Sequence, residues 1–472
     1  MKKNSLLLLV LMGVYSFTFT TQRSLASTIE NTPFYSTSDS HQSFLPVVLK
    51  YELQGYFVAP YGSDDNPGTL ELPWQTIGKA AEMLREGDTV YIREGVYTES
   101  ARFSYSGSKL NPIRIMAYPG ENPVIDGENT IPEPGGTLLR LYGDYIYASG
   151  LEVRNSAYAG IGVFGDYDVV DNMFVHHSQE QGIIVSYGQY SIVENSRIWR
   201  NAISNEYGQG GGYASGLSVI RNGVAYATIR NNLVWENWGD GIASSSADNI
   251  VIEGNIVHDN YSINIYLTDS TNILCQRNFV YADPSSYVYP YDTNGFSMGD
   301  EGYDPPSANI TIINNIAYGN YVNLWWWQGG EGGGMNNVLI ANNTFVNAFG
   351  EPERGRGNVL ISQGDHVNVV FTNNLVMQDG DLPVIATIDQ PGVTYSYNLW
   401  SKEPYDAASG PGDVIGDPML MQVGEPFFAD WFRLMDTSPA IGAAISLPDV
   451  SDDFFASLRD VAPDMGAVEY VP

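Results

Sequence analysis

Four residues have side chains and positions that could together support catalysis. Asp269 and Asp300 end two short apolar runs that belong to a repeated pattern, Arg221 ends a third run, and Asp240 opens another. Carboxylates that converge from neighbouring repeats can bind Ca²⁺, or can divide the work of a general acid and a general base. We therefore predict that Asp269, Asp300, Arg221 and Asp240 are catalytic, and that Asp269, Asp300 and Glu301 bind a Ca²⁺ cofactor.

Aromatic residues occupy equivalent runs of the same pattern. Trp325 and Trp327 are two positions apart in "NLWWW", and Tyr266 lies inside "NIYLT". A β-strand turns residues two apart to the same face, and exposed aromatic rings of this kind commonly mark ligand-binding grooves. We predict that Tyr266, Trp325 and Trp327 bind substrate. A loop that covers the tryptophans is the structural alternative.

Other candidate residues also have structural interpretations. Asp269 and Asp300 are equally consistent with tight turns, where Asp is frequent. His258 aligns with aromatic residues of neighbouring repeats, which favours a stacked structural histidine over a catalytic one. A structural role is likewise favoured for the pair His176-His177. The single cysteine, Cys275, falls in an apolar column, so we interpret it as a core residue.

An asparagine repeat positions these residues. Asparagine recurs at one alignable position, at intervals of 23, 37, 23, 23, 37, 28, 31 and 24 residues. A unit of about 23 residues that tolerates insertions is typical of a solenoid. The amide of Asn can donate and accept, so stacked copies can bond from coil to coil. The aligned residues are Asn172, Asn195, Asn232, Asn255, Asn278, Asn315, Asn343, Asn374 and Asn398.

Apolar columns accompany the asparagines. The residue three positions before each of the first eight is apolar, which predicts an inward column: Val169, Ile192, Ile229, Ile252, Cys275, Ile312, Ile340 and Phe371. Each coil then has three strands, and the third strand alternates between the core and a groove. Its predicted inward residues are Ile183, Leu217, Ile242, Ile265, Phe296 and Leu324, and its predicted outward residues are Ile184, Ser218, Ala243, Tyr266, Ser297 and Trp325. The fold class is therefore all-β, a right-handed parallel β-helix of ten or more coils.

The composition limits the kinds of partner that the protein can bind. The chain has 472 residues and a formal net charge of −32. It has no cluster of Lys and Arg, so a nucleic acid is excluded as a partner. Residues 1–26 read as a signal peptide, with two lysines, an apolar run and a small-residue cleavage site, and no other segment could span a bilayer. We predict a secreted or cell-surface monomer without stable membrane insertion.

The mature chain divides into a linker and one domain. Residues 27–54 are rich in Ser, Thr and Pro and predict a linker. Residues 55–472 predict the β-helix, with a capping helix over about 75–86, asparagine repeats over about 145–400 and a closing segment over 401–472.

Both ends of this domain are similar to known proteins. "YFVAPYGSDDNPGTLELPWQTIGKAAEMLREGDTVYIREGVYTES" resembles the opening of right-handed parallel β-helix proteins of the pectin-lyase-like superfamily, related to pectate lyases and chondroitinase-type lyases. "LRDVAPDMGAVEY" is similar to the closing coil of many secreted β-helix proteins. The resemblance implies a helix that caps the solenoid and a substrate groove on the third strand of each coil. It indicates polysaccharide as the partner, and it is specific for the fold rather than for the reaction.

A lack of lysine distinguishes the central part of this chain from the lyases that it resembles. Those enzymes abstract a proton with Lys or Arg assisted by Ca²⁺, and here no lysine occurs between Lys109 and Lys402. A lyase would have to use Arg221, a Tyr or a His. We predict a protein that acts on or binds extracellular polysaccharide, with lyase or hydrolase activity in an acidic groove. The alternative is a non-catalytic carbohydrate-binding or cell-surface structural protein.

Overall fold

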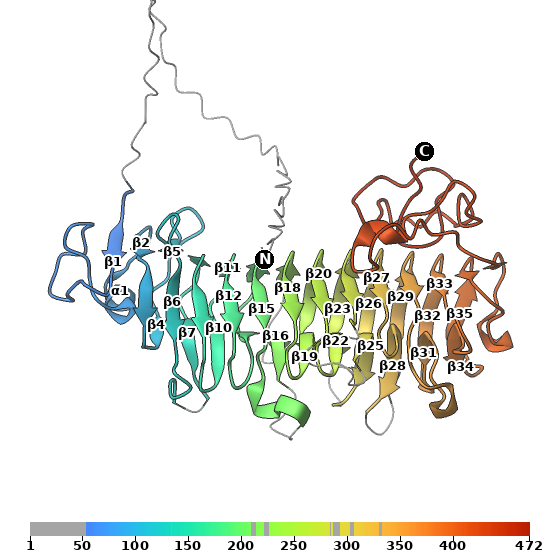
Figure 1. Cartoon of the computed structure of the whole chain (residues 1–472), viewed down its shortest axis with the longest axis horizontal. Coiled ribbons are helices and arrows are strands. Elements are labelled where there is room, and N and C mark those ends of the chain that lie inside the picture. The colour runs from blue at the N-terminus through green and yellow to red at the C-terminus, as the bar shows by residue number, and fades with distance from the viewer. Residues whose placement is uncertain are drawn as a thin grey trace, which may run out of the picture. The chain divides into compact units, whose positions relative to one another are not determined.

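The described chain is a solenoid of three parallel sheets with 13, 11 and 13 strands. The computed structural model describes residues 53–472 except 134, 209–213, 221–225, 284, 287–292, 303–305 and 330–332. Figure 1 shows the coils following one another along the long axis, and from β2 to β36 the chain visits the three sheets in turn. The predicted β-helix is therefore confirmed. The predicted signal peptide and nearly all of the predicted linker lie outside the described residues.

We name the sheets A, B and C in the order in which a coil visits them. Sheet A contains β1 Tyr56–Val58, β2 Thr89–Ile92, β5 Ile113–Ala117, β8 Ile146–Ser149, β11 Val169–Asp171, β14 Ile192–Glu194, β17 Thr228–Arg230, β20 Asp248–Glu253, β23 Thr271–Gln276, β26 Ala308–Ile313, β29 Asn336–Ala341, β32 Val367–Thr372 and β35 Val393–Ser396. Sheet B contains β3 Gly95–Tyr97, β6 Pro123–Asp126, β9 Glu152–Arg154, β12 Phe174–His176, β15 Arg197–Trp199, β18 Leu233–Trp235, β21 Ile256–His258, β24 Phe279–Tyr281, β27 Ile316–Tyr318, β30 Thr344–Val346, β33 Leu375–Met377, β36 Leu399–Trp400 and β37 Val414–Ile415. Sheet C contains β4 Ala101–Phe103, β7 Thr137–Leu141, β10 Ala159–Val163, β13 Ile183–Val185, β16 Ser215–Ile220, β19 Asp240–Ser245, β22 Ile263–Thr268, β25 Asn294–Asp300, β28 Leu324–Gln328, β31 Val359–Ile361 and β34 Ile385–Thr387.

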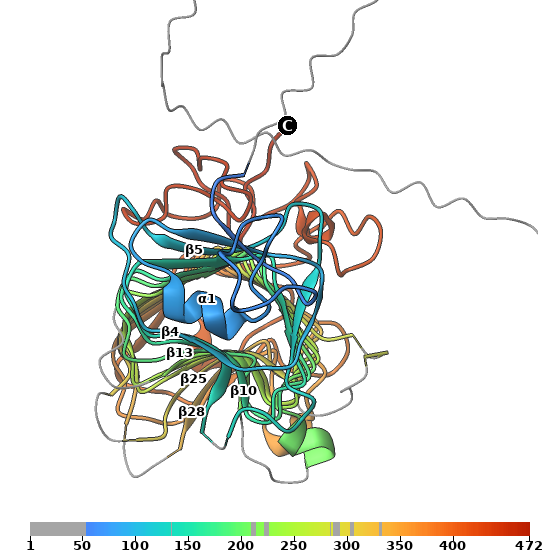
Figure 2. The ribbon, with the colours of Figure 1, turned by 90° about the vertical axis from the view of Figure 1, so that its left-hand side faces the viewer.

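A short helix closes the N-terminal end. α1 spans Ile77–Met83, inside the predicted range, and the Thr76 side chain accepts a hydrogen bond from the Lys79 amide as its N-cap. Ile77, Ala80 and Ala81 are buried against the first coils. Figure 2 looks along the solenoid from this end and shows α1 over the opening. The helix removes the open end of the apolar core from water.

The C-terminal segment packs on the side of the solenoid. It carries the 3-10 helices η3 Asp406–Ala408 and η4 Ala429–Phe432, while η1 Ile203–Gly208 and η2 Pro352–Arg354 belong to loops between coils. Trp431 and Phe432 pack with outward residues of sheet B such as Phe279 and Ile316. The segment "LRDVAPDMGAVEY" therefore covers sheet B and does not form a closing coil (Figure 1).

Asparagine side chains form two hydrogen-bonded ladders inside the solenoid. In the ladder at the turn between sheets A and B, each Nδ2 donates to the next Oδ1 at 3.0–3.2 Å. A second ladder lies at the turn between sheets B and C, with Nδ2···Oδ1 distances of 2.8–3.0 Å. The first contains Asn232, Asn255, Asn278, Asn315, Asn343, Asn374 and Asn398, and the second Asn201, Asn237, Asn260, Asn264, Asn320, Asn323 and Asn358.

The predicted ladder is wrong by one residue in its first two coils. Asn172 and Asn195 adopt left-handed φ angles of 49° and 54° beside the ladder. The ladder positions are taken by Met173 and Ser196, and the Ser196 amide donates to Asn232 Oδ1 at 3.0 Å.

The same shift applies to the apolar column beside the ladder. Val170 and Val193 are buried in the core, whereas the predicted Val169 and Ile192 are only partly buried. Two adjacent apolar residues in each strand made both registers possible, and the pairing of Val193 with Ile229 decides between them. From Ile229 onward the predicted inward column is confirmed, including the buried Cys275.

Replacing Asn255 by Ala should lower the free energy of unfolding by about 1 to 3 kcal/mol, because it leaves buried amides unpaired. Asn255 Nδ2 donates to the Ile229 carbonyl and to Asn278, and its Oδ1 accepts from Asn232. Urea unfolding measures the change. The matched control is Asn309→Gly, which removes two solvent-exposed side-chain hydrogen bonds, one donated to Asn272 and one accepted from Asn337, and should cost less than about 0.5 kcal/mol. Equal midpoints for Asn255→Ala and the parent would contradict the ladder.

Candidate functional site

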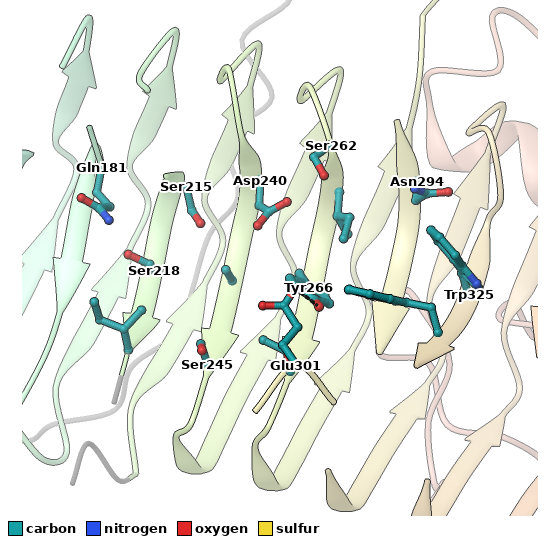
Figure 3. A pocket seen from close by; sticks show the side chains of 15 residues that line it. Gln181, Ser215, Ser218, Asp240, Ser245, Ser262, Tyr266, Asn294, Glu301 and Trp325 are labelled. Carbon is teal, nitrogen blue, oxygen red and sulfur yellow. Dashed lines mark hydrogen bonds between the residues drawn. The ribbon is translucent and has the colours of Figure 1, made fainter. Parts of the chain in front are cut away.

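Three columns of side chains on the outer face of sheet C line a cavity with a volume of 490 Å³. The alternation predicted for these strands is confirmed, because the predicted inward residues pair with one another from β13 to β28 and are buried. Figure 3 shows the columns crossing neighbouring strands. The described lining residues are Ser215, Asp240, Ile263 and Asn294 at the strand starts, Ser218, Ala243, Tyr266 and Trp325 in the second column, Ile220, Ser245, Thr268 and Trp327 in the third, and Gln181, Ser262 and Glu301.

Asp240 brings a buried carboxyl group to this cavity. It is the first residue of β19 and its side chain is buried. Burial, and then the negative charge of Glu301, raise the pKa of Asp240 to about 7, although hydrogen bonds from the Ile263 amide and the Ser262 hydroxyl act in the opposite direction. A carboxyl group with this pKa exchanges protons near neutral pH, which suits a general acid or base.

Glu301 brings a second carboxylate to the same cavity. It follows β25 directly, and its Oε1 accepts a hydrogen bond of 2.8 Å from the Tyr266 hydroxyl on β22. Burial, and also the charges of Glu301 and Asp240, raise the pKa of Tyr266, so its hydroxyl stays protonated as a donor. Figure 3 shows Glu301 and Tyr266 side by side, with Asp240 beyond them along the sheet.

The two predicted tryptophans line the cavity beside Tyr266. Trp327 lies opposite Gly299 in the sheet, and a Cβ at Gly299 would come within 2.8 Å of the indole Nε1. The missing side chain lets the indole approach Tyr266, and the two ring centroids are 6.5 Å apart. The ring centroids of Trp325 and Trp327 are 6.0 Å apart. The guanidinium carbon of Arg356 lies 5.0 Å from the centroid of the Trp325 ring. Both tryptophans are partly buried, so they form a wall of the cavity rather than exposed platforms.

Asp269 directly follows β22 and Asp300 is the last residue of β25, and neither lines the cavity. Asp269 Oδ2 accepts from the Gly302 amide at 2.9 Å, and Asp300 accepts from the Ser307 and Gly334 amides at 2.9 and 3.1 Å. Both carboxylates therefore hold loops that follow the strands of sheet C.

The predicted metal site is not assembled. No three His, Cys, Asp or Glu residues in the described part of the chain are grouped so that they could hold a metal ion. Glu301 accepts a hydrogen bond from the Tyr266 hydroxyl, whereas Asp269 and Asp300 accept hydrogen bonds from backbone amides. Arg221, the fourth predicted catalytic residue, lies outside the described residues.

Replacing Asp300 by Asn should destabilise the protein without abolishing activity. Both oxygens of Asp300 accept backbone amides, so Asn keeps one hydrogen bond and loses the other, at a cost of about 1 to 3 kcal/mol. Thermal unfolding measures the loss, and kcat of the folded variant should stay within about tenfold of the parent. A complete loss of turnover in a variant that keeps its fold would show that Asp300 is catalytic, as the sequence predicts.

Sequence reasoning missed most hydroxyl and amide groups of the cavity. Ser218 was placed in the outward column, but Ser245, Ser262, Gln181 and Asn294 were not singled out. Ser245 follows in register from the predicted column, because it lies two residues after Ala243 on the same strand. Ser262 and Gln181 precede their strands, where the alternation does not yet apply.

The structural interpretation of His258 and His176 agrees with the geometry. The His258 ring stacks on Tyr281 with centroids 4.4 Å apart and lies 6.2 Å from Trp235 in the preceding coil. His176 stacks in the same way on Trp199 at 4.2 Å. Both histidines belong to sheet B and lie outside the lining of the cavity.

None of the helices in the described part of the chain is long and apolar enough to cross a membrane.

Comparison with known proteins identifies the family. The protein YwoF of Bacillus subtilis is 40% identical over 101 residues, which are 21% of this chain and 22% of YwoF. Pectate lyase L of Dickeya chrysanthemi is 27% identical over 210 residues, 42% of this chain and 49% of the lyase, so each match covers less than half of the relative. The crystal structure of pectate lyase Pel9A is 22% identical, covers 88% of this chain and 96% of Pel9A, and has a TM-score of 0.57, which shows a common fold. The model of the Pel9A-like right-handed β-helix region matches residues 56–325, more than half of the chain, and the protein belongs to that family.

Proposed function

We propose that the protein is a secreted enzyme that cleaves polysaccharide, with Asp240 and Glu301 as its proton-transferring groups. The observation that carries the proposal is the position of Asp240, buried and with a raised pKa, in one cavity with Glu301 and an aromatic wall. Membership of a family whose relatives include pectate lyases supports a glycan as the substrate. The predicted signal peptide supports export.

The carboxyl pair fits acid and base chemistry on a glycosidic bond. In glycoside hydrolysis one protonated carboxyl group donates a proton to the leaving oxygen, and a second carboxylate acts as base or nucleophile. Asp240 is the group with the raised pKa and serves as the acid, while Glu301 serves as the second carboxylate. Tyr266, Trp325 and Trp327 contact the sugar rings and orient them between the two.

A polysaccharide lyase is the second candidate, and the family favours it. A lyase removes a proton beside the carboxyl group of a uronic acid, so it needs a base and a group that neutralises the carboxylate. Glu301 would be the base. Because Asp240 and Glu301 repel a uronate, this reaction would need a bridging cation, which keeps Ca²⁺ and Arg221 as proposals for this candidate alone.

A polysaccharide panel separates these reactions from binding alone. We expect new reducing ends without unsaturated products for a hydrolase, and both reducing ends and ultraviolet-absorbing unsaturated products for a lyase. Each substrate is assayed with Ca²⁺ and with a chelator. Binding to a polymer in affinity electrophoresis without either product would support the non-catalytic alternative and contradict the enzyme.

A further inference from the structure

We propose that Arg356 is a specificity-determining residue, whose guanidinium binds a carboxylate of the polysaccharide at the end of the cavity next to Trp325. This inference rests on the proposed function and names the residue that selects an acidic polymer. It follows from the position of Arg356 beside the aromatic wall, from the loop that holds it there, and from the absence of a carboxylate partner among the described residues.

Arg356 lies at one end of the cavity. Its guanidinium carbon is 5.0 Å from the ring centroid of Trp325, which lines the cavity. Arg356 comes shortly before β31, and β31 pairs with β28 on the side away from β25. In Figure 3 Trp325 stands at the end of the labelled row opposite to Gln181, with Asp240 between them. A polymer that lies across these strands and passes Trp325 therefore meets Arg356 next.

The loop before β31 holds this side chain in place. η2 Pro352–Arg354 ends at Gly355, whose left-handed φ of 69° turns the chain immediately before Arg356. A Cβ at Gly350 would come within 2.9 Å of the Arg356 Cβ, so the glycine lets the two sides of the loop approach. The guanidinium carbon also lies 5.8 Å from the ring centroid of Tyr321. Contact with two aromatic rings fixes the direction of the cation.

Arg356 has no carboxylate partner in the described part of the chain. The carboxylate of its own loop, Glu351, is already bonded, because its Oε2 pairs with Arg354 at 2.8 Å and accepts from the Tyr321 hydroxyl at 3.1 Å. The side chain of Arg356 is partly buried, and its enclosed Nε has no hydrogen-bond partner. A ligand therefore meets the two terminal amino groups, which can bind both oxygens of a carboxylate.

The charges along the cavity orient an acidic polymer. The described lining contains Asp240 and Glu301 and has no Lys, Arg or His. As the acid of the proposed hydrolase Asp240 is protonated, which leaves Glu301 as the charged carboxylate. A sugar carboxylate is attracted to Arg356 and repelled by Glu301. An acidic sugar therefore binds beside Trp325, and a neighbouring sugar of the same polymer reaches Asp240.

Three variants separate the charge of Arg356 from its packing. Arg356→Met removes the charge and keeps an unbranched apolar side chain against the Trp325 ring. Arg356→Lys keeps a cation on the same loop. The matched control is Arg197→Met, because Arg197 also lies over an aromatic ring, 5.3 Å from the centroid of Phe174, but belongs to sheet B. Thermal unfolding establishes that each variant is folded.

The experiment compares polymers that differ only in charge. Polygalacturonate and alginate are each prepared with free carboxyl groups and with the carboxyl groups reduced to neutral alcohols. Affinity electrophoresis, with Ca²⁺ and with a chelator, measures binding, and reducing ends and unsaturated products measure cleavage. We expect the wild type to bind at least one acidic form more tightly than its reduced form. Arg356→Met should bind that acidic form about tenfold more weakly, Arg356→Lys should fall between the two, and Arg197→Met should match the wild type.

The outcomes distinguish the inference from the proposed function. Cleavage with no preference for the acidic form overturns the role of Arg356 and leaves the enzyme intact. Unchanged binding of the acidic form by Arg356→Met, or equal losses in Arg356→Met and Arg356→Lys, also overturns that role. Binding of an acidic polymer that depends on Arg356 but yields no product supports the inference and overturns the enzyme. Neither binding nor cleavage of any polymer overturns both.

Discussion

Replacing Asp240 by Asn should lower kcat by about 10²- to 10⁴-fold, the usual contribution of a positioned acid or base. Asn preserves the shape of the side chain, and it can still accept hydrogen bonds from the Ile263 amide or the Ser262 hydroxyl, but it cannot transfer a proton. The binding of substrate should therefore survive while turnover is lost. Initial rates and affinity electrophoresis on the same polymer measure the two effects.

The pH profile tests the role of Asp240 separately. As a general acid Asp240 acts in its protonated form, so kcat/KM of the wild type should fall as pH rises through about 7. In Asp240→Asn this limb should disappear from the residual activity. The control variant is Asp389→Asn, which changes an exposed aspartate outside the lining of the cavity and should leave rate and profile unchanged. Full activity in Asp240→Asn would remove Asp240 from the mechanism.

Replacing Arg459 by Met should destabilise the packing of the C-terminal segment by about 3 to 5 kcal/mol, as expected when one partner of a buried ion pair is removed. The side chain of Arg459 is 4% exposed and pairs with Glu469 at 2.9 Å. It also donates to Asn314 Oδ1 at 2.8 Å and to the Gly466 carbonyl at 2.9 Å, so it joins residues 459–469 to the turn between β26 and β27. Without it the carboxylate of Glu469 stays buried and loses its cation.

Thermal unfolding and limited proteolysis measure this effect. We expect a lower Tm and faster cleavage within residues 401–472, where the segment covers sheet B. The matched control is Arg354→Met: Arg354 pairs with Glu351, and the two side chains are 60% and 44% exposed, so its loss should cost less than about 1 kcal/mol. If the two variants unfold alike, the buried pair does not stabilise the segment.

The sequence determined the periodic part of this protein. Each coil repeats the pairing of the coil before it, so the residue types at Ile229, Ile252 and Cys275 were enough to predict one inward column and the asparagine ladder beside it. The alternation of sheet C likewise predicted that Tyr266 would face outward. These features depend on neighbours at a constant spacing. Where two apolar residues were adjacent, as in Ile192-Val193, only the pairing between strands decided which one enters the core.

The tertiary structure alone decided which acidic residues share the cavity. Asp240, Asp269 and Asp300 looked alike in the sequence, but the loop amides of Gly302 and Ser307 bind the last two, and only Asp240 faces the cavity. Glu301 lies 35 residues from Tyr266 along the chain and reaches it because β25, which Glu301 directly follows, pairs with β22. Burial and the charge of Glu301 raise the pKa of Asp240, and Glu301 lies between β25 and β26, outside the repeated pattern. Contacts within the repeat are local and can be predicted from the pattern, whereas the insertions bring together residues whose proximity no periodicity specifies.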